Sequence, residues 1–128
     1  SEKLKLASSV LFSLPWNIFF RVKSDIQREK SEHSAVSACE LKYLFFSYFT
    51  ISAGYTDIRP GKESGVYAAI IPAAEAEMST YLYEESAKGG AIKLRYRKEN
   101  LSFHVRASLI ETGREREITA ESSLGFVF

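Results

Sequence analysis

The segment AIKLRYRKENLSFHVRASLIE, residues 91–111, decides the fold class of this chain. Apolar and polar side chains alternate in both of its halves, which is the pattern of half-buried β-strands. The dipeptide Glu99–Asn100 between the halves fits the tight turn of a β-hairpin. The segment therefore predicts two adjacent antiparallel strands, over 91–98 and 101–111.

The same alternation extends to both sides of this hairpin. Between residues 10 and 22 it predicts one or two strands, with Pro15 at a bend or edge. Further strands are expected over 65–72, 78–82, 114–120 and 124–128, with a turn at Gly89–Gly90. The stretch 23–33 is rich in charges of both signs, so we expect it to be a solvated loop.

Residues 34–51 fit two patterns. Ser34 is a suitable helix N-cap, and the alanines and charged residues that follow favour a helix over 34–46, then a strand to about residue 53. The aromatic residues of the same segment also alternate as they would in a strand. A second short helix is expected over 73–78, because Pro72 suits the first turn of a helix.

These elements predict a single domain spanning residues 1–128, with an α+β, mostly β fold. We expect an antiparallel sheet or sandwich of about seven to nine strands with one or two short helices, over 34–46 and 73–78. The connections are too short for the crossovers that parallel strands require. An all-β sandwich is the alternative.

Composition excludes several classes of protein. Hydrophobic residues make up 45% of the chain, aromatic residues 13% and charged residues 26%, which is the balance of a soluble globular domain rather than of a disordered, collagenous or disulfide-rich chain. The formal net charge of +1 names no partner. Cys39 has no cysteine to pair with, so we expect an intracellular, cytoplasmic protein.

Two observations bear on targeting. The longest apolar stretch, residues 43–51, is far shorter than the roughly 20 residues of a membrane-spanning helix, so no transmembrane segment is expected. The chain begins at Ser1 rather than at Met, and we expect it to be processed or cut from a longer protein.

The hairpin carries the one surface that suggests a ligand. If its apolar side chains face the core, its opposite face presents the cations Lys93, Arg95, Arg97, His104 and Arg106. Such a row predicts an anion-binding site for the phosphates of nucleic acid or for acidic lipid headgroups.

Internal neutralisation of this basic face is the alternative. Two sets of acidic residues are available for it, Glu115, Glu117 and Glu121 in one, and Glu75, Glu77, Glu84 and Glu85 in the other. Like charges that face each other across strands are destabilising, so either set would relieve the repulsion. The register between these segments decides which alternative holds.

No other chemistry is indicated. His33, Cys39 and His104 are scattered at spacings that match no metal site, so neither a metal nor a cofactor is expected. The only aspartates, Asp25 and Asp57, fall in expected loops, and no nucleophile motif occurs, so we expect no enzyme.

The leading expectation is a non-catalytic module that self-associates, as a matrix- or coat-type structural subunit does. Its basic hairpin face would bind a polyanion, either nucleic acid or an acidic membrane surface. The first alternative is a protein-recognition module that uses a sheet edge or an aromatic patch. The second is a small enzyme whose site is not recognisable from one sequence.

Overall fold

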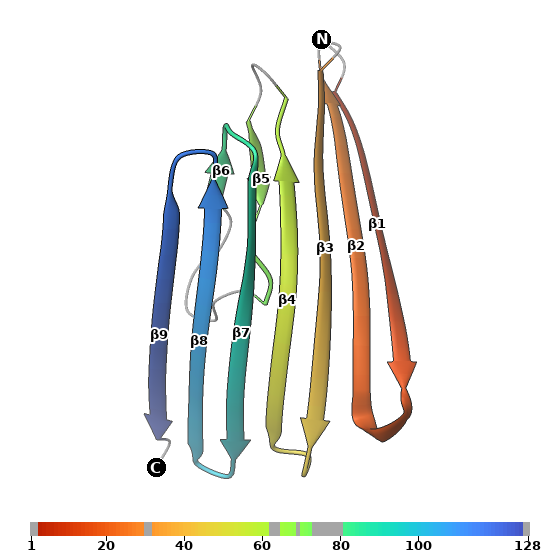
Figure 1. Ribbon diagram of the computed structural model, residues 1–128. Helices are drawn as coiled ribbons and strands as arrows, with labels where there is room; N and C mark the ends of the chain where they lie inside the picture. Colours follow the sequence, from red (N-terminus) through yellow and green to blue (C-terminus); the bar gives the residue numbers. More distant parts are fainter. Residues whose placement is uncertain (1–2, 30–31, 62–64, 69, 73–80, 127–128) are drawn as a thin grey trace.

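A computed structural model describes residues 3–29, 32–61, 65–68, 70–72 and 81–126. Its main body is one antiparallel sheet of seven strands in the order β1-β2-β3-β4-β7-β8-β9 (Figure 1). Each strand pairs with the strand before it in that order, so the sheet is a meander. The strands are β1 (Lys3–Leu14), β2 (Ile18–Glu29), β3 (Glu32–Phe45), β4 (Phe49–Arg59), β7 (Ala87–Lys98), β8 (Leu101–Thr112) and β9 (Arg116–Phe126).

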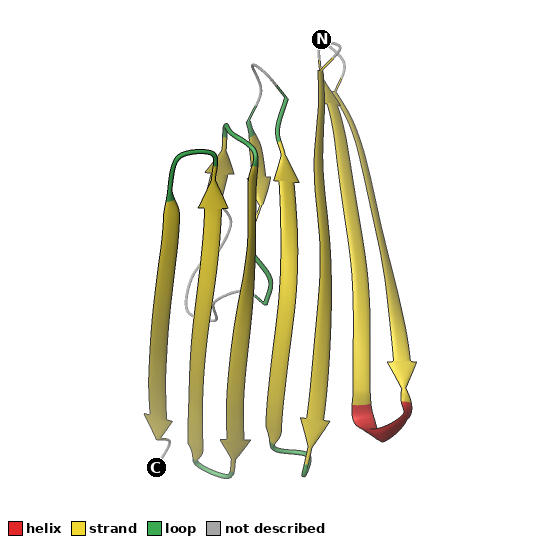
Figure 2. Ribbon diagram, in the orientation of Figure 1, coloured by secondary structure: helices red, strands yellow, loops and turns green. Residues whose placement is uncertain are grey.

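Tight turns join these strands at one end of the sheet. Pro15–Asn17 forms a short 3-10 turn between β1 and β2, and it is the only helical element among the described residues (Figure 2). Phe46 and Ser47 have positive φ angles in the turn between β3 and β4, and Glu99 does so in the turn between β7 and β8. The predicted hairpin and the bend at Pro15 are therefore confirmed.

The mostly β, antiparallel fold is confirmed, whereas the helix over 34–46 is wrong. Those residues belong to β3, which pairs along its length with β2 on one side and with β4 on the other. Two neighbouring strands outweigh the helix propensity of Ala35, Ala38 and Glu40, because sheet pairing and packing override local preference. The second helix, over 73–78, lies outside the described residues.

Two further expectations need correction. The stretch 23–33 is not a loop, because β2 continues to Glu29 and β3 begins at Glu32. Gly89 and Gly90 are not a turn but lie within β7. A Cβ atom on Gly89 would meet the carbonyl oxygen of Leu109, so the glycine permits close approach of a neighbouring strand there.

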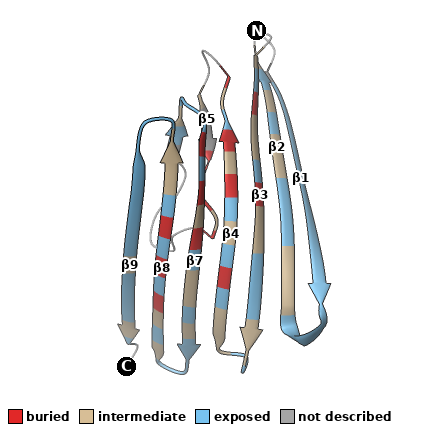
Figure 3. Ribbon diagram, viewed as in Figure 1, coloured by how far each residue is buried: buried red, intermediate tan, exposed pale blue. Residues whose placement is uncertain are grey.

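A small two-stranded sheet covers part of one face of the large sheet. Its strands are β5 (Val66–Ala68) and β6 (Tyr81–Tyr83), which lie between β4 and β7 in the chain. Ala68 and Ile70 pack against Ile58, Ala87 and Ala91 to form the core. Burial is accordingly concentrated on the central strands, while β1 and β9 are largely exposed and β2 is partly exposed (Figure 3).

Candidate functional site

The two faces of the large sheet differ sharply in chemistry. Because side chains alternate along a strand, the register assigns each residue to one face. The polar face carries the odd-numbered residues of β1, β2, β7 and β9 and the even-numbered residues of β3, β4 and β8. It is the face that the β5–β6 sheet covers, through contacts to residues such as Ile58 and Ala87. The opposite face is termed the apolar face.

The apolar face is exposed. All but four of the exposed large hydrophobic side chains in the described part of the chain belong to it, the exceptions being Leu11, Trp16, Phe46 and Leu82. Ile92 in the centre of the sheet is 61% exposed, and Ile118 on β9 is 75% exposed. Monomeric soluble proteins rarely expose an apolar surface that spans a whole sheet, so this face is the candidate functional site.

The apolar runs are longest on the outer strands, because those on β3, β4 and β7 cover only 39–45, 49–55 and 90–96. On the apolar face of β1, β2, β8 and β9, runs of about nine residues extend over 6–14, 18–26, 101–109 and 118–126, and a serine lies inside each of them except that on β8. At about 3.3 Å per residue, each run is roughly 27 Å long. The runs on β1 and β2 lie nearer the end of the sheet at which β1 begins than the runs on β8 and β9 do. Such a shift between strands is expected when tilted strands share one flat apolar band.

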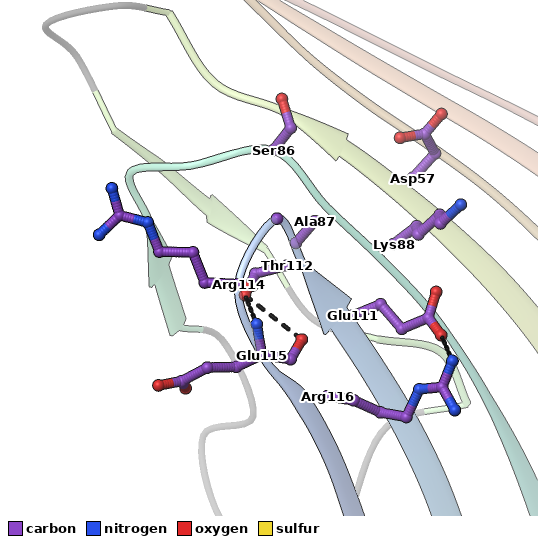
Figure 4. A pocket seen from close by; sticks show the side chains of 10 residues that line it. Asp57, Ser86, Ala87, Lys88, Glu111, Thr112, Arg114, Glu115 and Arg116 are labelled. Atoms are coloured by element: carbon purple, nitrogen blue, oxygen red, sulfur yellow. Dashed lines mark hydrogen bonds and ion pairs between the residues drawn. The ribbon is translucent and has the colours of Figure 1, made fainter.

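A polar row crosses the apolar face near one end, here called the charged end. Its members are successive register partners on all seven strands: Arg116, Glu111, Lys88, Asp57, Ser37, Ser24 and Ser8. Arg116 Nη2 lies 2.7 Å from Glu111 Oε1, and Figure 4 shows this pair beside Lys88 and Asp57. On β1 and β2 the apolar pattern resumes beyond the serines, with Leu6 and Ile26.

A shallow concavity of about 590 Å³ adjoins the charged end. Lys88, Arg114 and Arg116 line it together with Glu111 and Glu115, so its cations lie among carboxylates. The Arg116–Glu111 ion pair uses one of these cations within the row itself. The concavity therefore lacks the one-sided charge of an anion site, and we treat it as part of the boundary of the apolar face.

Aromatic side chains gather at the other end, here called the aromatic end. Phe45 lies at ring-centroid distances of 5.2 Å from Tyr43 and 4.4 Å from Phe49, and Phe49 contacts Tyr96 at 6.3 Å. Tyr48, in the turn after β3, contacts Tyr96 and lies under the Lys98 ammonium at 4.7 Å. Trp16, in the turn after β1, is 82% exposed. The apolar face thus ends in a layer of aromatic residues.

The predicted basic residues all lie on the polar face of the sheet. Lys93 is the direct register partner of Arg106, and Arg95 is that of His104, with Arg97 one pleat further along β7. Arg95 and Arg97 are exposed, as expected, whereas His104 and Arg106 are each only 8% exposed. The expected burial of the apolar side of the hairpin is wrong, because Ile92 and Val105 on that side are exposed.

Arg106 is neutralised within the protein. Its Nη1 lies 3.2 Å from Oε1 of Glu121, one of the acidic residues proposed for this role. Its Nε donates to the Pro72 carbonyl oxygen at 2.8 Å, and its Nη2 donates to the Ile70 carbonyl oxygen at 3.2 Å. Arg106 therefore fastens the segment that follows β5 onto the polar face.

Other acidic residues of the two sets take different positions. Glu117 lies on the polar face of β9, and Glu115 lies in the turn before that strand. Glu84 and Glu85 are exposed beyond β6, whereas Glu75 and Glu77 lie outside the described residues. Among the described residues of the two acidic sets, Glu121 is thus the one that is recorded in an ion pair with a predicted site residue, Arg106.

Two other features are absent from the part of the chain that the structure describes. Among the described residues, no three His, Cys, Asp or Glu side chains are grouped so that they would hold a metal ion. Within the same residues, no helix has the length and apolar character needed to cross a membrane.

No protein-family model, curated protein or solved structure matches this chain. The geometry of the two faces therefore carries the functional argument alone. Sequence reasoning missed the apolar face because it assumed that apolar side chains pack inward. Sorting odd and even residues on all strands together, rather than on the hairpin alone, would have found it.

Proposed function

We propose that this chain forms a membrane-inserted β-sheet whose apolar face contacts lipid acyl chains. The observation that carries the proposal is the exposure of one apolar face across all seven strands, from Val10 and Phe12 on β1 to Ile118 and Leu124 on β9. Burying a side chain of this kind contributes about 1.5–3 kcal/mol, so leaving the whole face in water is costly. Hydrocarbon removes that cost without requiring shape complementarity.

The dimensions of the face support lipid as the occupant. The hydrocarbon core of a bilayer is about 30 Å thick, and strands that cross it need about 9–11 residues. The apolar runs of about nine residues reach this length on both outer pairs of strands. A surface that binds one protein partner has no reason to keep this length on two separate pairs of strands.

The two boundaries of the face support the same occupant. Charged side chains such as Lys88 and Glu111 avoid hydrocarbon, so the charged members of the row, on β4, β7, β8 and β9, mark a limit of the lipid-covered band on those strands. Aromatic side chains are favoured at the membrane–water interface, where Trp16, Tyr48 and Tyr96 at the aromatic end would lie. The polar face, with Arg106 and Glu121, turns away from the acyl chains.

The edges of the sheet extend the proposal to self-association. An open sheet edge in hydrocarbon leaves backbone groups without hydrogen-bond partners, so β1 and β9 need neighbouring strands in the membrane. We take these neighbours to be further copies of this chain. Pairing β9 with β9 of a second copy in antiparallel fashion would bring Glu121 near its own equivalent, which is unfavourable. Pairing β9 with β1 of a second copy does not oppose Glu121 to itself, because the two strands differ in sequence.

Depth-dependent fluorescence quenching tests the membrane location. Trp16 is the single tryptophan, so a Trp16→Phe background carrying one new tryptophan gives a site-specific signal. Leu41→Trp places the probe on the apolar face, and Lys42→Trp places it on the polar face at the adjacent residue. After reconstitution into vesicles that contain brominated phosphatidylcholine, we expect bromines deep in the acyl chains to quench residue 41 strongly and residue 42 weakly.

The wild-type Trp16 supplies the second part of the test. Because it lies in the turn at the aromatic end, shallow bromines should quench it better than deep ones. Equal quenching at residues 41 and 42, or none at either, would contradict lipid contact through the apolar face. In that case, loss of partner binding on truncation of Tyr43 or Tyr96 would favour the protein-recognition alternative.

A further inference from the structure

We infer that the polar face carries a site for a small oxyanion such as inorganic phosphate, near the turn between β7 and β8. This inference goes beyond the proposed membrane insertion and does not depend on it, because it concerns the other face. Three of the basic residues predicted from the sequence, Arg95, Arg97 and His104, line this site. It leaves Arg106 out, because that guanidinium already has Glu121 and two carbonyl oxygens as partners.

The site is a concavity of about 190 Å³. Arg95 and Arg97 line it from β7, Ser102 and His104 from β8, and Ser123 from β9. The register places Arg95 opposite His104 and Arg97 opposite Ser102, so cations and hydroxyls from adjacent strands face the same space. A volume of this size admits a single phosphate group.

The chemistry of the lining suits an oxyanion. Guanidinium groups offer several N–H donors in a planar fork, which matches the oxygens of phosphate. His104 Nδ1 and Ser123 Oγ lie 2.7 Å apart, so this pair is fixed at the wall of the site. Glu99 also lines the concavity at the turn, and its carboxylate opposes an anion there.

Arg97 is the residue on which recognition depends most. Its side chain is exposed, and within the described residues it is recorded in no ion pair or side-chain hydrogen bond. Its backbone N–H donates to the Tyr48 carbonyl oxygen at 2.8 Å, which holds this part of β7 against the preceding turn. The backbone of Arg97 is therefore anchored at the edge of the concavity, and its guanidinium is available to a ligand.

Calorimetric titration with inorganic phosphate, at constant ionic strength, tests the inference. Arg97→Gln should weaken phosphate binding by about tenfold or more, as expected for loss of a hydrogen bond to a charged group. Lys98→Gln is the matched control, because it removes the same charge at the next residue but from the apolar face. It should leave phosphate binding within about twofold.

Two results would overturn the inference. Equal weakening by Arg97→Gln and Lys98→Gln would mean that phosphate responds only to overall charge. Absence of phosphate binding by the wild-type protein would remove the site altogether. The quenching of tryptophan at residue 41 is measured on the separate Trp16→Phe, Leu41→Trp protein and does not involve the phosphate site, so failure of this inference is distinguished from failure of the proposed membrane insertion.

Discussion

Arg106 and Glu121 face each other across β8 and β9, with Nη1 and Oε1 3.2 Å apart. The same guanidinium reaches the carbonyl oxygens of Ile70 and Pro72, so one side chain links the large sheet to the segment that covers it. This link explains why an arginine lies buried on a face with few apolar neighbours: its donors are satisfied by backbone acceptors as well as by a carboxylate.

Removing this arginine should cost more stability than removing its acidic partner. Arg106→Gln leaves two carbonyl oxygens and Glu121 without their donor, and we expect a loss of about 3 kcal/mol in the free energy of unfolding. Glu121→Gln keeps a hydrogen-bond acceptor at a partly exposed position, so its cost should be about 1 kcal/mol or less. Urea unfolding followed by Trp16 fluorescence measures both. Equal costs would mean that the contacts to Ile70 and Pro72 contribute little.

Gly54 should be intolerant of any larger residue. A Cβ atom there would meet the carbonyl oxygen and carbon of Ile71, where the covering segment crosses β4. Gly54→Val is expected to lower the free energy of unfolding by about 1–3 kcal/mol by pushing this segment off the sheet. Ala53→Val, on the apolar face of the same strand, is the control and should have little effect. Proteolysis between β5 and β6 should also become faster in Gly54→Val alone.

A charge in the middle of the apolar face distinguishes lipid from water. Ile92 is 61% exposed, so in water Ile92→Lys should change stability by no more than about 0.5 kcal/mol. In a bilayer the same lysine should cost about 2–4 kcal/mol and reduce the fraction of protein that inserts. Thr119→Lys, on the polar face, is the control and should insert normally. Comparable insertion of both variants would contradict the proposed function.

Self-association through unlike edges predicts a specific cross-linking pattern. Cys39→Ser removes the native thiol, after which Ser8→Cys marks β1 and Ser122→Cys marks β9. A short bis-maleimide should join the two variants when they are mixed in one vesicle, and neither variant should cross-link with itself. Dimers from Ser122→Cys alone would instead indicate pairing between like edges. If no variant cross-links, copies of this chain do not meet at their edges.

The sequence predicted the strands well where alternation is strong and turns are tight. The hairpin over 91–111 and the bend at Pro15 depend on neighbouring residues, and both are confirmed. The helix over 34–46 failed because alanine and glutamate favour a helix locally, whereas β3 is stabilised by β2 and β4, which lie elsewhere in the chain. The expected loop over 23–33 failed because mixed charges such as Lys23 and Asp25 are typical of solvated loops, whereas here they lie on the polar face of a strand.

The site was harder to predict than the fold. Placing Lys93, Arg95, Arg97, His104 and Arg106 on one face needed only alternation and the register of one hairpin. Whether that face is buried depends on β5 and the segment after it, which no local pattern connects to the polar face. The partner of Arg106 likewise depends on the register of β9 against β8. Long-range pairing therefore determines which of two plausible faces meets the surroundings.

The odd number of strands in the sheet has a consequence for sidedness. β1 begins at the charged end, and β9, the seventh strand of the meander, ends at the aromatic end (Figure 1). In the proposed membrane insertion, Lys3 and Phe126 therefore lie toward opposite sides of the bilayer. A protease added outside sealed vesicles would reach only one of the two termini in each inserted molecule, and which terminus it removes would reveal the direction in which the chain inserts.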